Sequence, residues 1–199
     1  MYTEDQKGYL KVGAMLGLDI SVYSNPELTV EQMDVIIFAM THGVDMKPIA
    51  KPEYSINDMW KFAVSERFGK DYIHYIDEGF NWDQIQQIKD YKDRGLDATE
   101  IENPKLSHSR MNLIKVGMLN GVPAKLINNP DMTIPSIELI LDGYPKGFDY
   151  SDVTTLTHKQ YDVLKKYLIK GIDVRPALNL NLTPQEMNNI LQNSRKGRD

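Results

Sequence analysis

The sequence repeats itself at an interval of 26 residues from one end to the other. Glycines mark this interval, with six steps of 26 and one step of 24, at Gly17, Gly43, Gly69, Gly95, Gly121, Gly147, Gly171 and Gly197. Two residues after seven of these eight glycines lies an aspartate, as in Gly17-Leu18-Asp19. A fixed period of this length is typical of repeat proteins, in which each repeat buries its apolar face against its neighbours.

A second series supplies the residues expected to begin helices. Ser, Thr or Asn, the usual N-cap residues, recurs at Thr3, Thr29, Ser55, Asn81, Ser107, Thr133, Thr157 and Thr183. Several are followed three residues later by Gln or Glu, which fits a capping box. Each long helix should run to the glycine, which suits the left-handed turn after a helix. The aspartate then caps a short helix that ends near a proline, because the residue before proline avoids helical geometry.

Apolar residues recur in each repeat and define the expected core, as at Met33 and Ile36 on one face of a helix. The tenth residue after the cap is often small, as at Gly13, which we attribute to close approach of neighbouring long helices. The sequence predicts an all-α solenoid, one domain over residues 1–199, in which each repeat is a long helix, glycine turn, short helix and proline turn. Repeats start near 3, 29, 55, 81, 107, 133, 157 and 183, with an irregular stretch at 143–157.

Composition excludes several kinds of site and partner. The 199 residues are 41% hydrophobic and 26% charged, with a formal net charge of −5. Mild acidity argues against duplex DNA as a partner, since phosphate binding needs a basic face. Without cysteine, disulfides and thiolate metal sites are impossible. The sequence contains neither a membrane-span pattern nor a signal-peptide pattern, so we expect a cytoplasmic protein that does not bind membranes.

Catalytic patterns are missing from the sequence. The four histidines fall in different repeats, at His42, His74, His108 and His158. The aspartates recur in nearly every repeat, so helix capping explains them better than catalysis does. Neither a phosphate-binding glycine loop nor a nucleophile motif occurs. We therefore expect a protein that is not an enzyme and that uses no cofactor or metal ion.

Apolar residues that interrupt an otherwise polar position mark a candidate protein-binding surface. Trp60 is the outlier at the fifth position after the cap, while Val12, Phe38 and Val64 occupy the ninth. Positions four residues apart share a helical face, so these four side chains would form an apolar stripe over the first three repeats. Exposed Trp and Phe are typical of protein interfaces. The alternative is that the stripe packs against the layer of short helices.

The segment Gly-Leu-Asp-Ile-Ser-Val-Tyr-Ser-Asn-Pro-Glu-Leu at 17–28, followed by Glu-Gln-Met at 31–33, resembles a repeat of helical proteins from Firmicutes, their phages and mobile elements. The repeat there is similar to Gly-Leu-Asp-Val-Ser-x-Tyr-Ala-x-Pro-x-Phe-x-x-x-Gln-Met. The resemblance extends over nearly the whole chain, although the third repeat lacks the proline and the sixth lacks much of the short helix. It implies a helical repeat scaffold and carries over no catalytic residue.

Together these observations favour a non-enzymatic scaffold that binds another macromolecule, with a protein as the expected partner. The resemblance implies one specific version, a phage or mobile-element inhibitor of a host defence enzyme. The alternative is a protein that binds RNA or single-stranded nucleic acid, since helical repeats can contact one base per repeat. Lysines do recur eight residues after the cap, at Lys11, Lys89, Lys115 and Lys165, but apolar residues interrupt the series.

Overall fold

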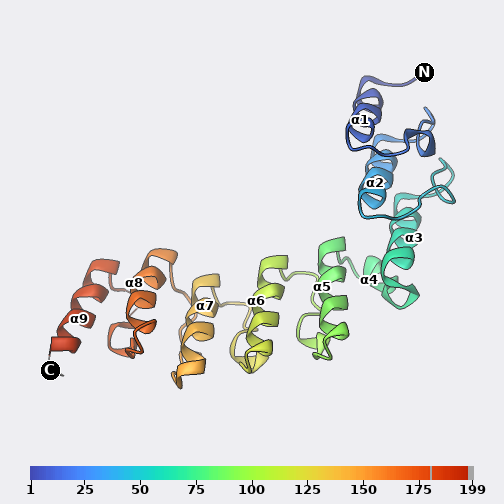
Figure 1. The fold of residues 1–199 in the computed structure, drawn as a ribbon. Helices are drawn as coiled ribbons and strands as arrows, with labels where there is room; N and C mark the ends of the chain where they lie inside the picture. The colour runs from blue at the N-terminus through green and yellow to red at the C-terminus, as the bar shows by residue number, and fades with distance from the viewer. Residues whose placement is uncertain (180, 197–199) are drawn as a thin grey trace. The chain divides into compact units, whose positions relative to one another are not determined.

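The computed structural model describes residues 1–179 and 181–196, and these residues form helices and turns with no β-strand among them (Figure 1). The all-α prediction is therefore confirmed for this part of the chain. The residues group into two compact units, Met1–Lys89 and Asp90 onward, and the boundary falls within helix α5 (Trp82–Asp93). Sequence alone gave no sign of this boundary. Gly197, the last glycine of the series, lies outside the described residues.

In the first compact unit, long α-helices are separated by short helical turns. Its elements are α1 (Glu4–Met15), η1 (Ile20–Val22), α2 (Val30–Thr41), α3 (Ile56–Phe68), η2 (Lys70–Tyr72), α4 (His74–Asp77) and the first part of α5. Helix α2 packs on α1 and on α3. The elements named η are 3₁₀ turns, so the predicted short helix is mostly a tighter turn, and only the third repeat adds an α-helical turn, α4.

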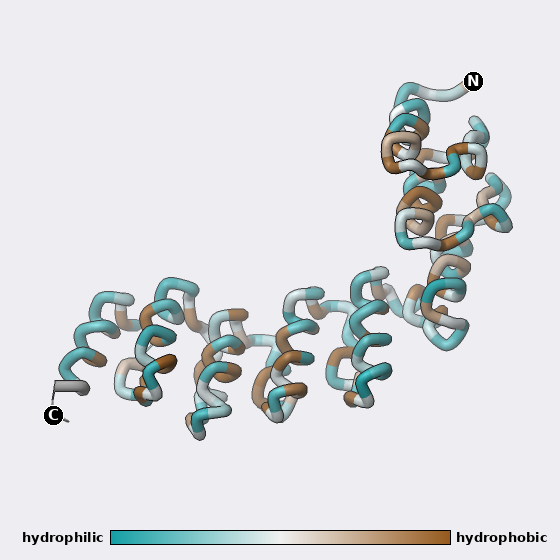
Figure 2. The backbone as a smooth tube through the Cα atoms, in the orientation of Figure 1, coloured by the Kyte–Doolittle hydropathy of each residue, from teal (hydrophilic) through white to brown (hydrophobic). Residues whose placement is uncertain are grey.

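The second compact unit continues the same alternation. Its elements after α5 are η3 (Ala98–Glu100), α6 (His108–Leu119), η4 (Ala124–Leu126), α7 (Ile134–Gly143), η5 (Tyr144–Lys146), α8 (His158–Leu168), η6 (Arg175–Ala177) and α9 (Pro184–Lys196). In the predicted irregular stretch, Pro145 lies in η5 and α7 is only 10 residues long. Helix α8 still packs on α7. Figure 2 shows that α7, which contacts α6 and α8, is far more hydrophobic than α9.

Side chains cap the helices as the sequence predicts, with one exception. In α2, the hydroxyl of Thr29 accepts a hydrogen bond from the backbone N–H of Gln32, and the Gln32 side chain accepts one from the backbone N–H of Thr29. Side-chain caps are present at Thr3, Thr29, Ser55, Asn81, Ser107, Thr157 and Thr183. Thr133 is the exception, because its hydroxyl donates to the carbonyl oxygen of Leu156 at 2.8 Å.

The glycines at the ends of the long helices adopt the left-handed conformation that we predicted. The φ angle is 80° at Gly43, 107° at Gly69 and 69° at Gly95. A Cβ atom is unfavourable in this region, which explains why the chain uses glycine there. The helix ends inferred from the sequence are thereby confirmed.

The predicted core positions are buried, and Met33 and Ile36 are both 0% exposed. The small residues at the tenth position fit the predicted close approach of neighbouring long helices at Gly117, where a Cβ atom would meet Leu141 of α7, but not at Gly13. A Cβ atom on Gly13 would overlap the hydroxyl of Tyr23, which belongs to the same repeat. Gly13 therefore makes room for a tyrosine ring of its own repeat instead of a neighbouring long helix.

Buried glutamines join a helix to the turn that precedes the next one. Nε2 of Gln32 donates to the carbonyl oxygen of Tyr54 at 2.7 Å and to that of Pro52 at 3.3 Å. Gln6 makes the same pair of bonds, to the carbonyl oxygens of residues 26 and 28, which lie 20 and 22 residues further along the chain. In the second compact unit, the guanidinium group of Arg110 donates in the same way to the carbonyl oxygen of residue 132, which lies 22 residues further along the chain. The sequence marked the glutamines as capping residues only, so this second role was not predicted.

The variant Gln32→Ala is expected to lower the free energy of unfolding by about 2 kcal/mol, because two partly buried carbonyl oxygens lose their donor. Urea denaturation followed by tryptophan fluorescence measures the change. Gln86→Ala, at an exposed position in α5, is the control and should change stability by less than about 0.5 kcal/mol. Equal stabilities of the two variants would contradict the assigned role of Gln32.

Candidate functional site

The four residues of the predicted apolar stripe do not share one environment. Val12 on α1 is 48% exposed and Phe38 and Trp60 are half-buried, whereas Val64 on α3 is 0% exposed. The expectation that Val64 lies on a binding surface is therefore wrong, and Val64 belongs to the core. The third repeat differs from the others because both η2 and α4 pack against α3. This helix consequently has less open surface than α1.

Phe38 and Trp60 do come together, with ring centroids 5.3 Å apart in an edge-to-face arrangement. Trp82, the first residue of α5, lies 5.5 Å from Phe38 and 6.3 Å from Trp60 between ring centroids. The ring of His42 stacks on Phe38 at 4.3 Å, and that of Phe68 lies 4.7 Å from Trp82. We call these five side chains, Phe38, His42, Trp60, Phe68 and Trp82, the aromatic cluster.

Sequence reasoning missed Trp82, although a signal for it was present. Trp82 directly follows the cap Asn81, and it is only 6% exposed. The same position in the other repeats holds no Trp, Phe or Tyr; the residues there are Glu4, Val30, Ile56, His108, Ile134, His158 and Pro184. Trp82 is therefore an outlier at its position among the repeats, just as Trp60 is at the fifth position after the cap.

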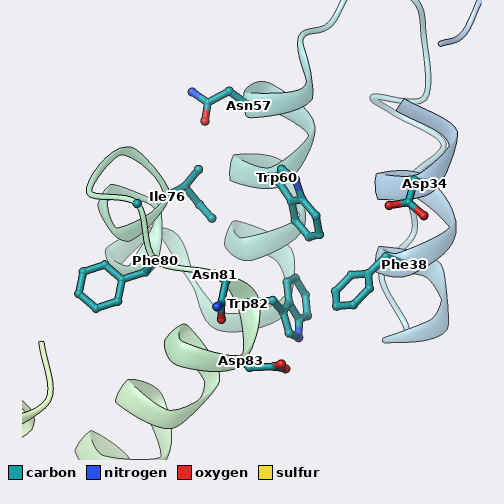
Figure 3. A pocket seen from close by; sticks show the side chains of 10 residues that line it. Asp34, Phe38, Asn57, Trp60, Ile76, Phe80, Asn81, Trp82 and Asp83 are labelled. Carbon is teal, nitrogen blue, oxygen red and sulfur yellow. The ribbon is translucent and has the colours of Figure 1, made fainter. Parts of the chain in front are cut away.

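The aromatic cluster borders a pocket of about 610 Å³ in the first compact unit, which we call the aromatic pocket. Figure 3 shows Phe38, Trp60 and Trp82 gathered between α2, α3 and the start of α5. Ile76 and Phe80, from the segment around α4, also line the pocket. Its polar lining consists of Asp34, Asn57, Asn81 and Asp83. Large apolar rings and carboxylates therefore face the same space.

Carboxylates lie at two places around the aromatic pocket. In Figure 3, Asp34 lies near Phe38 on α2, and Asp83 lies beyond Trp82 on α5. Neither aspartate forms an ion pair with another residue in the part of the chain that the structure describes. The negative charge of Asp34 raises the pKa of the Tyr9 hydroxyl, which places Tyr9 of α1 close to this carboxylate.

The lysine of α3, Lys61, is already paired with another carboxylate. Nζ of Lys61 lies 2.7 Å from Oδ1 of Asp77, and this hydrogen bond holds the pKa of the Asp77 carboxyl below its ordinary value. The amide of Asn57 donates to the same oxygen at 3.4 Å. Within the described residues, Lys61 thus pairs with Asp77 and with neither Asp34 nor Asp83.

The net negative charge of the chain is confined to the first compact unit. Residues 1–89 contain 8 Lys and Arg against 14 Asp and Glu, whereas the residues from 90 onward contain 15 against 14. Part of this excess of acidic residues lies beside the aromatic pocket. Glu4 and Asp5 line a second pocket, of about 440 Å³, together with Tyr9 and Val12. Val12 of the predicted stripe therefore lies in an acidic environment as well.

A pocket of similar size in the second compact unit has a different character. It measures about 550 Å³ and is lined by Asp149, Ser151, Asp152, Val153, Arg175 and Leu178, without an aromatic ring. Nε of Arg175 donates to Oδ2 of Asp173 at 2.7 Å, so its charge is already matched. The aromatic pocket is therefore the better candidate for recognition of a partner.

The chemistry that the aromatic pocket offers is binding through ring faces and carboxylates, a combination that attracts organic cations. The one imidazole in the cluster is held in place, since Nδ1 of His42 lies 2.8 Å from the carbonyl oxygen of Phe38. Among residues 1–179 and 181–196, no three side chains of His, Asp or Glu are grouped to hold a metal ion. Over the same residues, no helix has the length and apolar character needed to cross a membrane.

No protein-family model matches the chain, no curated protein matches its sequence, and no solved structure matches its fold.

Proposed function

We propose that this protein is a non-enzymatic helical repeat scaffold that binds another protein through the aromatic pocket. One observation carries the proposal: Phe38 and Trp60 stay half-buried and line a pocket. Several rings of the core are fully enclosed instead: Tyr23 and Tyr91, for example, are 0% exposed. A partly exposed tryptophan surrounded by other rings and polar residues is typical of the centre of a protein interface.

The proposed scaffold is a solenoid of repeats about 26 residues long. Support comes from features that recur at this interval, namely the side-chain caps, the left-handed glycines and the bonds of Gln6 and Gln32 to the following turn. A preformed helical surface loses little conformational freedom when it binds, which favours tight association. The scaffold offers the partner a rigid aromatic surface.

A narrower version places the protein in the cytoplasm as a phage or mobile-element inhibitor that occupies a host defence enzyme. The resemblance of residues 17–33 to the repeat of Firmicutes, phage and mobile-element proteins supports this version. Its partner would be an enzyme, and the aromatic pocket would be the contact surface.

Binding of RNA or single-stranded nucleic acid is the second candidate, since bases stack on exposed aromatic rings. Two of the four lysines in the recurring series argue against it. Nζ of Lys115 lies 2.7 Å from Oδ2 of Asp90, and Nζ of Lys165 lies 3.6 Å from Oδ2 of Asp142. The carboxylates at the aromatic pocket would also repel phosphate groups. A protein partner is therefore the favoured proposal.

Affinity capture from a lysate of the native host tests the protein-binding proposal. The bait proteins are the native chain, Trp60→Ala and the control Tyr144→Ala, which removes a half-buried ring from the second compact unit. We expect one protein to be retained by the native chain and the control, and Trp60→Ala to reduce its retention about 30-fold, the effect of a hot spot near 2 kcal/mol. Circular dichroism confirms that each bait is folded.

Two results would overturn the proposal. One is equal retention of the same protein by native chain and Trp60→Ala, which would move the contact away from the aromatic pocket. The other is loss of all retained material after nuclease treatment of the lysate, which would identify nucleic acid as the partner.

A further inference from the structure

We infer that the aromatic pocket receives an arginine side chain from a basic segment of the protein partner. This inference rests on the proposed function and adds the chemistry of the contact. It combines three observations on the first compact unit: aromatic rings that line a pocket, two carboxylates that form no ion pair, and an excess of acidic residues around them.

The ring faces of the aromatic cluster suit a planar cation. Phe38, Trp60 and Trp82 lie within 6.3 Å of one another between ring centroids and line the same pocket. Trp82 is only 6% exposed, so a guanidinium group would contact the half-buried rings of Phe38 and Trp60 by cation–π attraction, for which tryptophan is the best ring. Arginine is more weakly hydrated than lysine, so it also loses less solvation energy when it enters an aromatic pocket.

Two carboxylates are available to complete the contact. Asp34 and Asp83 line the aromatic pocket from α2 and from α5, and Figure 3 shows them on different sides of the rings. A guanidinium group presents a fork of donors that matches a carboxylate with two parallel hydrogen bonds. Asp77 offers a comparison, because Lys61 at 2.7 Å already satisfies it from within the chain. Asp34 and Asp83 form no ion pair within the described residues, so a cation of another molecule can pair with them.

The surroundings favour a basic segment over a single small cation. The first compact unit carries 14 acidic against 8 basic residues. The neighbouring pocket is lined by Glu4, Asp5 and Tyr9, and the Tyr9 hydroxyl lies close enough to Asp34 for that carboxylate to raise the pKa of Tyr9. Two acidic pockets with aromatic lining are therefore adjacent, which matches a peptide with successive cationic side chains. The long-range field would also accelerate association with a basic partner.

The tryptophans provide a direct readout of this contact. The chain contains two tryptophans, Trp60 and Trp82, and both line the aromatic pocket. Their emission therefore reports on this pocket alone. The probe is a short capped peptide of alternating glycine and arginine, titrated into the native full-length protein at low ionic strength. We expect a saturable change of emission intensity, and we expect added salt to weaken it.

Matched variants distinguish the contribution of Asp34 and Asp83 to peptide binding from that of the negative charge of the whole unit. Asp34→Asn combined with Asp83→Asn is expected to weaken the binding of the arginine peptide by about tenfold or more, because charge-assisted bonds are lost. The control combines Glu27→Gln with Glu66→Gln, which removes the same charge from exposed positions of the same unit outside the pocket. We expect the control to change the binding by less than about twofold, since separated exposed charges are screened.

Several outcomes would overturn the inference. One is the absence of a saturable emission change up to about 1 mM arginine peptide, because a dissociation constant in the millimolar range is too weak for a recognition site. Another is equal binding of the peptide by the aspartate variant and by the control. A third is equal binding of free arginine amide or spermine, which would assign the pocket to small cations. If these tests fail while Trp60→Ala still loses the captured protein, the proposed function stands and the arginine contact does not.

Discussion

Ile36→Ala is expected to lower the free energy of unfolding by about 3 kcal/mol, because it leaves a cavity in a packed core. The Ile36 side chain is 0% exposed, and its helix α2 packs on both α1 and α3. Urea denaturation followed by tryptophan emission is the measurement, since Trp60 and Trp82 both report on the first compact unit. Ile36→Val is the graded control and should cost about 1 kcal/mol.

Urea denaturation monitored by circular dichroism shows whether Trp60 belongs to the core or to a binding surface. Since Trp60 is only half-buried, Trp60→Ala is expected to cost about 1 kcal/mol, clearly less than Ile36→Ala. An equal loss in the two variants would identify the aromatic cluster as core and would remove the main support for a binding surface there. An Ile36→Ala cost under 1 kcal/mol would show that α2 is not packed as described.

Gly13→Ala is expected to lower the free energy of unfolding by about 2 kcal/mol, because a Cβ atom there would overlap the Tyr23 hydroxyl. This loss exceeds the gain of roughly 0.5–1 kcal/mol that alanine brings to the interior of a helix. Gly8→Ala is the matched control on the same helix, since no atom lies within 4 Å of a Cβ built there. It should stabilise the protein by that smaller amount, so the two substitutions have opposite signs.

A second variant tests the stated cause of the Gly13 effect. Within the described residues, the Tyr23 hydroxyl has no hydrogen-bond partner. Tyr23→Phe should therefore cost little by itself and should recover part of the stability lost in Gly13→Ala. Losses that simply add in the double variant would show that the overlap with Tyr23 is not the cause.

Local features of the fold were predictable from the sequence because their causes are local. A cap such as Thr29 needs only its own hydroxyl and a backbone N–H three residues away, and the left-handed glycines need only their own dihedral angles. The recurring apolar positions were equally predictable, because burial of Ile36 follows from its place on the helical face. Repetition made each of these inferences stronger, since the same pattern occurs in neighbouring repeats.

Features that join distant residues were not predictable in the same way. The capping role of Gln32 was found, but its bonds to Pro52 and Tyr54 depend on how successive repeats stack. Val64 was misplaced because its burial depends on the packing around α3, against which both η2 and α4 lie. Trp82 contacts Phe38 across more than one repeat, and only the packing brings the two rings together.

The glutamine bonds have a consequence for how the walls of the aromatic pocket are held. Gln32 fixes the turn before α3 to α2, so the wall that holds Phe38 and Trp60 opens only if both helices are disturbed. In the next repeat this position holds Asp58, which is shorter and whose carboxylate bonds to Ser55 instead. The opposite wall, with Ile76 and Phe80, is instead tied to α3 by Lys61 and Asn57, whose side chains bond to Asp77 of α4. The two walls are therefore held by different chemistry: added salt weakens the exposed ion pair of Lys61 with Asp77 and leaves the amide bonds of Gln32 intact.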